Sequence, residues 1–133
     1  NFRVVNDGNA YIASGFHHVS DINKKNTINS LTSKYDIIFD NLRPVSYKYN
    51  NGTSGRTHTG FIAQEVGEAL EKANVPMKDF AAVSISDTEA GDGSWYLRYE
   101  EFISLNTWQI QKAKTRISEL EEKVAKLEEM ING

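Results

Sequence analysis

Residues 110–131 read IQKAKTRISELEEKVAKLEEMI, and apolar side chains recur in them with the seven-residue period of a coiled coil. One position of the repeat, called a, holds Ile103, Ile110, Ile117, Val124 and Ile131. The second position, d, holds Asn106, Ala113, Leu120 and Leu127. The pattern predicts a long C-terminal helix with a seam for further copies of the chain. We expect the interface to consist of Ile110, Ile117, Leu120, Val124, Leu127 and Ile131.

Charged residues beside this seam favour a parallel arrangement. In a parallel assembly in register, Arg116 faces Glu121 of the neighbouring copy, and Lys123 faces Glu128. Each exposed pair contributes only about a few tenths of a kcal/mol, but together they bias direction and register. Ile or Val at a with Leu at d favours two strands in isolated peptides, so the helix alone does not specify three. The alternative is one amphipathic helix packed on its own domain.

The rest of the chain predicts a small α+β domain of short strands and helices. Apolar runs separated by turn residues predict strands, and one helical pattern lies between them. The expected elements are a hairpin within 1–16 with its turn at 6–9, a strand at 45–49, a helix at 60–73, and strands at 80–88 and 95–99 around a turn at 89–93.

A further helix is predicted to begin at Ser20 and to end before Pro44. Serine is a favoured N-cap, and Asp21 in the first turn suits the helix dipole. Apolar residues then follow at helical spacing of three and four, which indicates one buried face. These residues are Ile28, Leu31, Tyr35, Ile38 and Leu42.

Composition excludes several classes of protein. A net charge of −3 argues against a general nucleic-acid-binding surface, and the absence of cysteine excludes disulfides and thiolate chemistry. No apolar run is long enough to span a membrane, and the first residues do not form a signal peptide. Because the chain does not begin with Met, we expect it to be a fragment of a longer protein.

Ser20 and the lysines that follow it form the candidate for covalent chemistry. A serine hydroxyl becomes a nucleophile when a base takes its proton, and a neutral lysine amine can be that base. In a continuous helix Lys24 lies about 40° from Ser20 and Lys25 about 140° away, so helix geometry favours Lys24. Asp21 opposes the loss of charge by either lysine unless it is paired elsewhere. The alternative is a plain N-cap followed by solvated lysines.

Other candidate sites are weaker. Lys24, Asp21 and His18 are accessory candidates beside Ser20. A Ser-His pair with Asp21 as its orienter is conceivable, but adjacent residues seldom converge on one site. His17, His18 and His58 lack the spacing of zinc ligands, so we expect no metal. The glycine-containing loop at 50–59 lacks the Walker spacing, and no other motif predicts a cofactor.

Taken together, these segments resemble the chaperone-of-endosialidase family, the self-cleaving C-terminal chaperone domains of phage tail spikes, fibres and neck appendages. The resemblance runs in the family's order from Ser20 to the C-terminus. The matching segments are Ser20-Asp21-Ile22-Asn23-Lys24-Lys25-Asn26 with Ile28, Leu42-Arg43-Pro44-Val45-Ser46-Tyr47-Lys48-Tyr49, His58-Thr59-Gly60-Phe61-Ile62-Ala63-Gln64-Glu65-Val66, Tyr99-Glu100-Glu101-Phe102-Ile103 and the closing coiled coil.

The resemblance implies an intramolecular chaperone that forms a homotrimer, folds an upstream fibrous part of its own polypeptide and then cuts itself off between Val19 and Ser20. It makes Ser20 the nucleophile and Lys25, not Lys24, the general base. It also implies three parts: the end of the upstream client at 1–19, the chaperone and autoprotease at 20–104, and the trimerisation helix at 105–133. The domain would act in the host cytoplasm during virion assembly and be released as the upstream protein joins the tail.

Two other functions remain open from sequence. One is a permanent trimerisation and attachment module that never cuts. The other is the equivalent self-cleaving domain of a membrane-tethered transcription factor.

Overall fold

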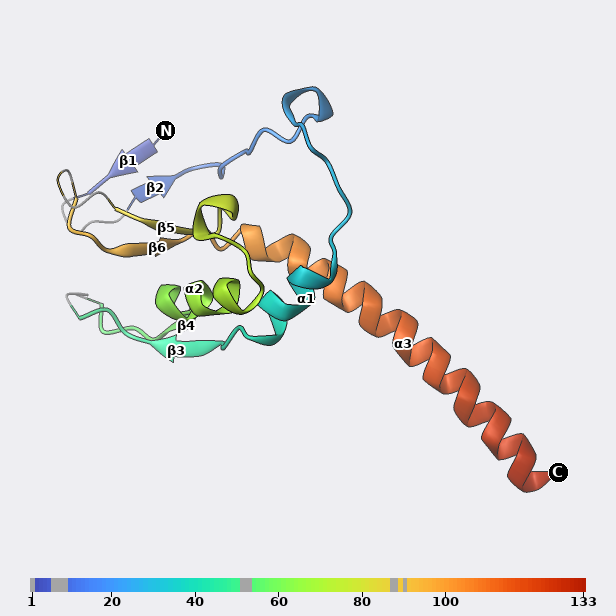
Figure 1. Ribbon diagram of the computed structural model, residues 1–133. Coiled ribbons are helices and arrows are strands. Elements are labelled where there is room, and N and C mark those ends of the chain that lie inside the picture. The colour runs from blue at the N-terminus through green and yellow to red at the C-terminus, as the bar shows by residue number, and fades with distance from the viewer. Residues whose placement is uncertain (1, 6–9, 51–53, 87–88, 90) are drawn as a thin grey trace. The chain divides into compact units, whose positions relative to one another are not determined.

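The computed structural model describes residues 2–5, 10–50, 54–86, 89 and 91–133. The chain divides into two compact units, one formed by 1–30 and 46–58 and the other by 31–45 and 59–133. The described elements are short strands, short helices and one long C-terminal helix, coloured along the chain in Figure 1. The predicted α+β class with a long final helix is therefore confirmed.

The first unit begins with a small antiparallel hairpin. Strand β1 (Phe2–Val4) pairs with β2 (Ala10–Ile12), with Phe2 opposite Ile12. The predicted strands of this hairpin are confirmed, whereas the predicted turn at 6–9 lies outside the described residues. Both strands are exposed, so the hairpin buries little apolar surface within its own unit.

The predicted helix from Ser20 to Leu42 is wrong over its first half. Only a 3-10 turn, η1 (Ile22–Lys24), forms near its start, and α1 (Ser33–Asp40) begins nine residues after that turn ends. Thr27 between them has a φ of 52°, and the Asn29 side chain donates to the Thr27 carbonyl at 3.1 Å. Such side chain–backbone bonds compete with helix formation, and a β-branched residue at positive φ interrupts it. Ile28, assigned to the buried face, is accordingly 64% exposed.

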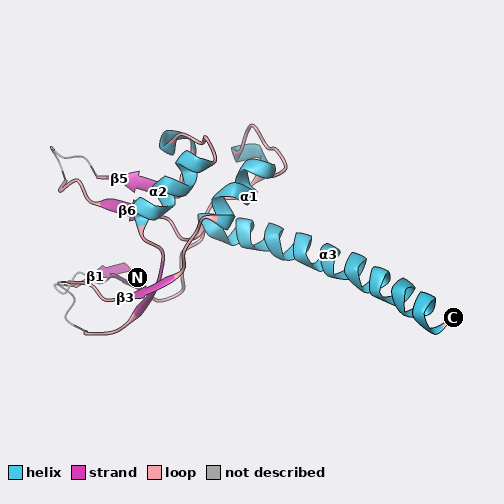
Figure 2. Ribbon diagram, turned by 60° about the horizontal axis from the view of Figure 1, so that its bottom comes forward, coloured by secondary structure: helices cyan, strands magenta, loops and turns pink. Residues whose placement is uncertain are grey.

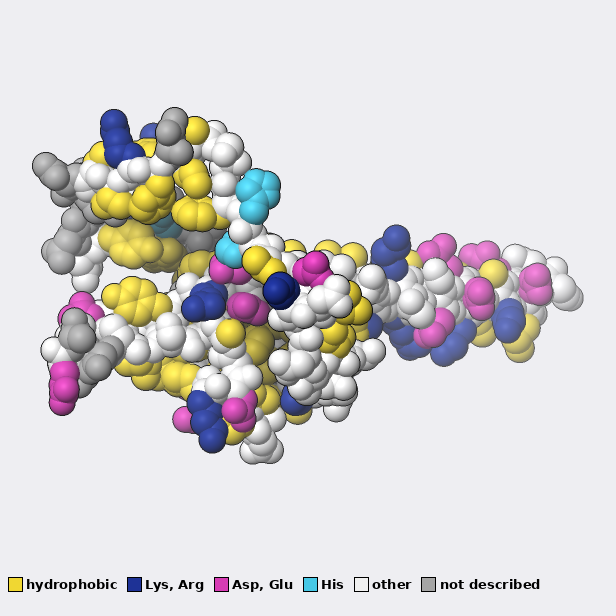
Figure 3. Space-filling view, turned by 90° about the horizontal axis from the view of Figure 1, so that it is seen from above, with side chains coloured by type: hydrophobic (Ala, Val, Ile, Leu, Met, Phe, Trp, Pro, Cys, Tyr) yellow, Lys and Arg dark blue, Asp and Glu magenta, His cyan; other side chains and the backbone are white. Residues whose placement is uncertain are grey.

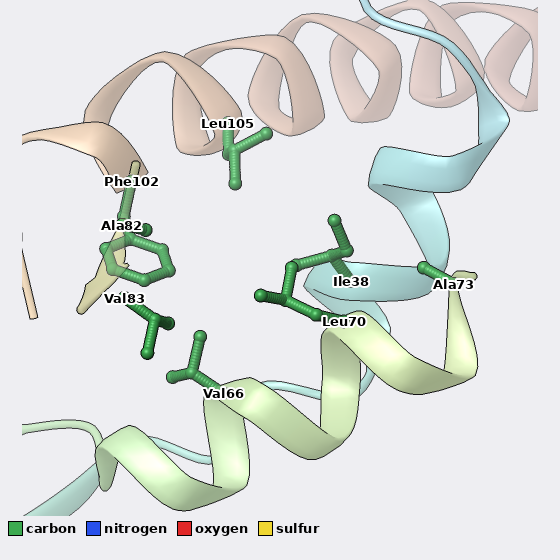
Figure 4. Packing of buried hydrophobic residues seen from close by; sticks show 8 residues of the cluster. All are labelled: Ile38, Val66, Leu70, Ala73, Ala82, Val83, Phe102 and Leu105. Carbon is green, nitrogen blue, oxygen red and sulfur yellow. The ribbon is translucent and has the colours of Figure 1, made fainter. Parts of the chain in front are cut away.

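The core of the second unit lies among three helices and a two-stranded sheet. Helix α2 (Ala63–Lys72) packs against α1 and against β5 (Val83–Ile85) and β6 (Trp95–Leu97), and α3 (Glu101–Asn132) contributes its first turns. Strands β5 and β6 pair antiparallel as predicted, but the turn predicted between them is only partly within the described residues. Figure 4 shows the buried side chains meeting between these elements: Ile38, Val66, Leu70, Ala73, Ala82, Val83, Phe102 and Leu105.

A close approach of two segments explains the glycine of the Gly60-Phe61-Ile62 run. The Tyr99 hydroxyl accepts a hydrogen bond from the Phe61 N–H at 3.2 Å and lies so near Gly60 that a Cβ there would overlap it. The Tyr99 ring also lies 6.4 Å from that of buried Phe102. The contact between Phe61 and Tyr99 therefore holds the segment before α2 against the segment before α3.

A further two-stranded sheet consists of β3 (Val45–Tyr47) and β4 (His58–Gly60). Within the first unit the Tyr47 ring stacks on the His58 imidazole, with 5.6 Å between the ring centroids, and Tyr49 meets the same imidazole edge-on. The predicted strand at 45–49 is thus shorter than expected, and His58 belongs to an aromatic cluster.

An ion pair joins α2 to the segment after α1. Arg43 donates two hydrogen bonds to the Glu65 carboxylate, at 2.7 and 2.6 Å. These bonds hold the pKa of Glu65 below its usual value of 4.5. A carboxylate whose pKa is lowered by folding stabilises the fold above its unfolded pKa and stops doing so as the pH falls through the folded pKa.

We therefore expect Glu65→Gln to weaken the acid sensitivity of the fold. The wild-type free energy of unfolding should decline as the pH falls below about 4.5, the ordinary value, and the variant should lose less over the same range because this linkage is gone. Urea unfolding at a series of pH values measures the difference. Glu68→Gln, on the exposed side of the same helix, is the control and should follow the wild type. Equal pH slopes for Glu65→Gln and wild type would contradict the assignment.

Helix α3 uses different faces for its own unit and for solvent. Phe102 and Leu105 are buried in the core, and farther along Gln109 and Lys112 both donate to Asp36 of α1, at 2.8 and 2.5 Å. Those two bonds lower the pKa of Asp36. From 110 to 133 every residue is exposed, and Figure 2 shows α3 continuing as one long helix past α1 and α2.

Candidate functional site

The Ser20 hydroxyl and the Lys25 amine lie in direct contact within one chain. Lys25 Nζ donates a hydrogen bond to Ser20 Oγ at 2.7 Å. Both residues belong to the first unit and both are exposed. The contact brings together a candidate nucleophile and a candidate base at the distance that proton transfer requires.

The short turn η1 explains why Lys25 reaches Ser20. The residues of η1 follow the tight 3-10 geometry, in which side chains three apart eclipse, so Lys24 follows Asp21 rather than Ser20. Lys25 ends the turn with φ −120° and ψ 157°, an extended conformation. The preference of a continuous helix for Lys24 does not apply here, because no continuous helix forms.

Asp21, and not Ser20, is the N-cap of the turn. The Asp21 carboxylate accepts from the Asn23 N–H at 2.8 Å. The predicted capping role of Ser20 is therefore wrong, and Ser20 lies one residue outside the turn. Aspartate is as favourable an N-cap as serine, so the sequence carried this signal. The carboxylate expected to oppose loss of charge by the lysines is engaged by the backbone.

His17, His18 and Val19 lie before the turn in a segment that is neither helix nor strand. His17, His18 and Val19 are exposed, and Val19 is 78% exposed. Within the described residues neither His17 nor His18 hydrogen-bonds to Ser20, so the accessory role considered for His18 has no contact behind it. In the same part of the chain, no three His, Asp or Glu side chains gather as a metal site.

Exposure determines what the Ser20–Lys25 pair can do in a single chain. An ammonium ion can donate to a hydroxyl but cannot take its proton, so a lysine acts as a base only in the form of its neutral amine. Removal from water favours the neutral amine. The apolar side chains near the pair in sequence are also exposed to solvent, namely Phe16, Val19, Ile22 and Ile28. Covering this segment would both bury apolar surface and create the conditions for a base.

The predicted seam of α3 is likewise uncovered in one chain. Ile110, Ile117 and Leu120 are 60%, 55% and 44% exposed, and Val124, Leu127 and Ile131 are also exposed. Figure 3 shows apolar side chains in among charged ones along this helix. Arg116, expected to face Glu121 of a neighbour, pairs within its own helix with Glu119 at 3.2 Å. In the described residues no helix is both long and apolar enough to cross a membrane.

Comparison with known proteins supports the resemblance read from the sequence. Residues 20–75 match the family model described as chaperone of endosialidase. The fold is similar to a solved structure described as a novel intramolecular chaperone, with a TM-score of 0.60 and 19% identity over 73% of this chain and 99% of the other. No curated protein sequence matches the chain. From Ser20 to Val75, therefore, the chain is similar to the chaperone of endosialidase family.

Proposed function

We propose that this chain is an intramolecular chaperone that trimerises through α3, assists the folding of a fibrous part of its own polypeptide upstream, and then cuts itself between Val19 and Ser20. The observation that carries the catalytic part is the 2.7 Å contact between Lys25 Nζ and Ser20 Oγ. The chaperone part rests on the family of residues 20–75 and on the fold shared with an intramolecular chaperone.

The proposed reaction begins with neutral Lys25 as general base. Its amine takes the proton of Ser20 Oγ, which attacks the Val19 carbonyl carbon. The Val19–Ser20 C–N bond then breaks, and the Ser20 nitrogen takes up a proton and leaves as an amine. Val19 is now held as an ester on Ser20 Oγ. Water hydrolyses the ester and gives a Val19 carboxylate and a free Ser20 hydroxyl.

Assembly of several chains would bury the surfaces that are exposed in a single chain. The α3 seam presents a row of exposed Ile, Val and Leu side chains that further copies would bury, and its flanking charges favour parallel chains. Parallel chains place equivalent domains at the same end of the bundle, where the exposed segment around Ser20 can be covered. A cut that follows assembly also leaves the folded client kinetically trapped, because the chaperone no longer equilibrates with it. The number three comes from the family resemblance.

The proposed place of action is the cytoplasm of an infected cell. A chaperone that leaves its client there would be absent from the mature virion tail. The lack of cysteine is compatible with assembly in a reducing compartment.

The direct test is release of a fragment that begins at Ser20. The chain is expressed with additional upstream sequence, and the products are separated on a denaturing gel and sequenced from their N-termini. We expect a fragment starting Ser20-Asp21-Ile22, and none from Ser20→Ala. An intact chain that nevertheless assembles fully would instead show a permanent trimerisation module.

A further inference from the structure

We propose that Asp21 is a positioning residue for the Ser20–Lys25 pair, and that it acts through its hydrogen bond to the backbone rather than through its charge. This inference rests on the proposed function, because it concerns the geometry of the same pair. It assigns a role to a carboxylate that was expected to work against the lysine.

The contacts of η1 show how little holds the turn together. Two backbone bonds close it, Lys24 N to Asp21 O at 2.9 Å and Lys25 N to Ile22 O at 3.3 Å. None of its residues is buried, so no core packing supports it. The Asp21 side chain adds a third bond, to the Asn23 N–H at 2.8 Å.

The position of η1 between Ser20 and Lys25 determines the distance between their side chains. Ser20 precedes the cap and Lys25 follows the last residue of η1, so the turn sets the distance between them. If the turn opens, four residues of exposed chain separate Ser20 from Lys25, and many conformations keep the hydroxyl and the amine apart. Helix nucleation is unfavourable for so short a segment. The fraction of molecules with the pair in contact should therefore follow the strength of the cap.

Replacing Asp21 separates its two possible effects. Asparagine accepts the same backbone hydrogen bond and is an equally favoured N-cap, but it carries no charge. Alanine removes both the bond and the charge. Loss of a cap costs about 1 kcal/mol, which lowers the equilibrium constant for closing the turn about fivefold and the closed fraction by up to that factor.

We expect self-cleavage of the chain with upstream sequence to slow up to about fivefold, and more than about twofold, in Asp21→Ala and to stay within about twofold of wild type in Asp21→Asn. The pH profile of the Asn variant should match the wild type, because the base is unchanged. Asp40→Ala, at the C-terminal end of α1, is the control and should cleave at the wild-type rate. An Asn variant as slow as the Ala variant, or with a shifted profile, would show that Asp21 acts by charge. An Ala variant as fast as wild type would overturn the proposal.

A second measurement does not depend on cleavage. In a Lys25→Ala background the backbone of the turn persists and the intact chain accumulates. We expect amide exchange of Asn23 and Lys24, followed by NMR, to accelerate in Asp21→Ala and to be unchanged in Asp21→Asn. If no chain cleaves, the proposed function fails while this measurement still decides whether Asp21 closes the turn. Unchanged exchange in the Ala variant would overturn the positioning role in that case too.

Discussion

Lys25→Ala should abolish self-cleavage, whereas Lys24→Ala should leave its rate within about twofold of wild type. General-base catalysis typically contributes about 10²–10⁴-fold, and Lys25 is the residue whose amine reaches Ser20 Oγ, at 2.7 Å. Lys24 has the same side chain one residue away, but the hydrogen bond to Ser20 Oγ comes from Lys25. The two variants therefore differ in position and not in chemistry. The measurement is the rate at which a fragment beginning at Ser20 appears.

Mixed assemblies show whether the pair works within one chain. Ser20→Ala chains and Lys25→Ala chains are expressed together, each with a distinguishable tag, so that they co-assemble. Since the hydrogen bond joins residues of the same chain, we expect no cleavage of either. Cleavage of the Lys25→Ala chain alone would mean that a lysine of a neighbouring chain acts as the base for its serine.

In the comparison of single variants, slow cleavage in Lys24→Ala together with normal cleavage in Lys25→Ala would make Lys24 the base.

Ile117→Asp should abolish assembly and, with it, cleavage. Ile117 lies in the middle of the seam and is 55% exposed in one chain, so its burial depends on other copies. A carboxylate at this position would place one charge per chain on the axis of the bundle, and burying unpaired like charges is costly. We expect sedimentation equilibrium to give the mass of a monomer and the gel to show intact chain.

Ser118→Asp is the matched control. It introduces the same side chain at the next residue, which is outside the a and d positions, and we expect a wild-type oligomer with wild-type cleavage. The core of the second unit does not include either residue, so circular dichroism should show its helices retained in both variants. A monomeric Ile117→Asp chain that still cleaves would separate catalysis from assembly and contradict the proposed gating. An Ile117→Asp chain that remains oligomeric would contradict the seam itself.

The elements that the sequence predicted correctly are those indicated by several residues at once. Helix α3 was predictable because the same period recurs over three heptads, so no single residue decides it. The β5–β6 pair was also predictable, because two apolar runs flank a stretch rich in glycine and acidic residues. In both cases local preference and packing agree.

The region from Ser20 to Leu42 was not predictable from apolar spacing, because spacing alone says nothing of interruptions. Ile38 is buried as expected, yet Thr27 and Asn29 break the helix that would have connected it to Ser20. The residues of the candidate pair were recognised through the family motif. Their contact geometry depends on a three-residue turn, and a turn that short has no periodicity to detect.

The two faces of α3 also determine how the protein can be re-engineered. The hydrogen bond from Lys112 to Asp36 lies near the last contact of α3 with α1, while the exposed seam continues to Ile131. In the proposed assembly, another parallel coiled coil could therefore replace the distal segment, provided that the graft keeps the phase of the heptads. Adding or removing a whole heptad leaves each domain facing as before, whereas one inserted residue turns it by about 100° around the stem. In the proposed assembly, the number of residues in α3 therefore sets the rotation of each domain about the helix axis.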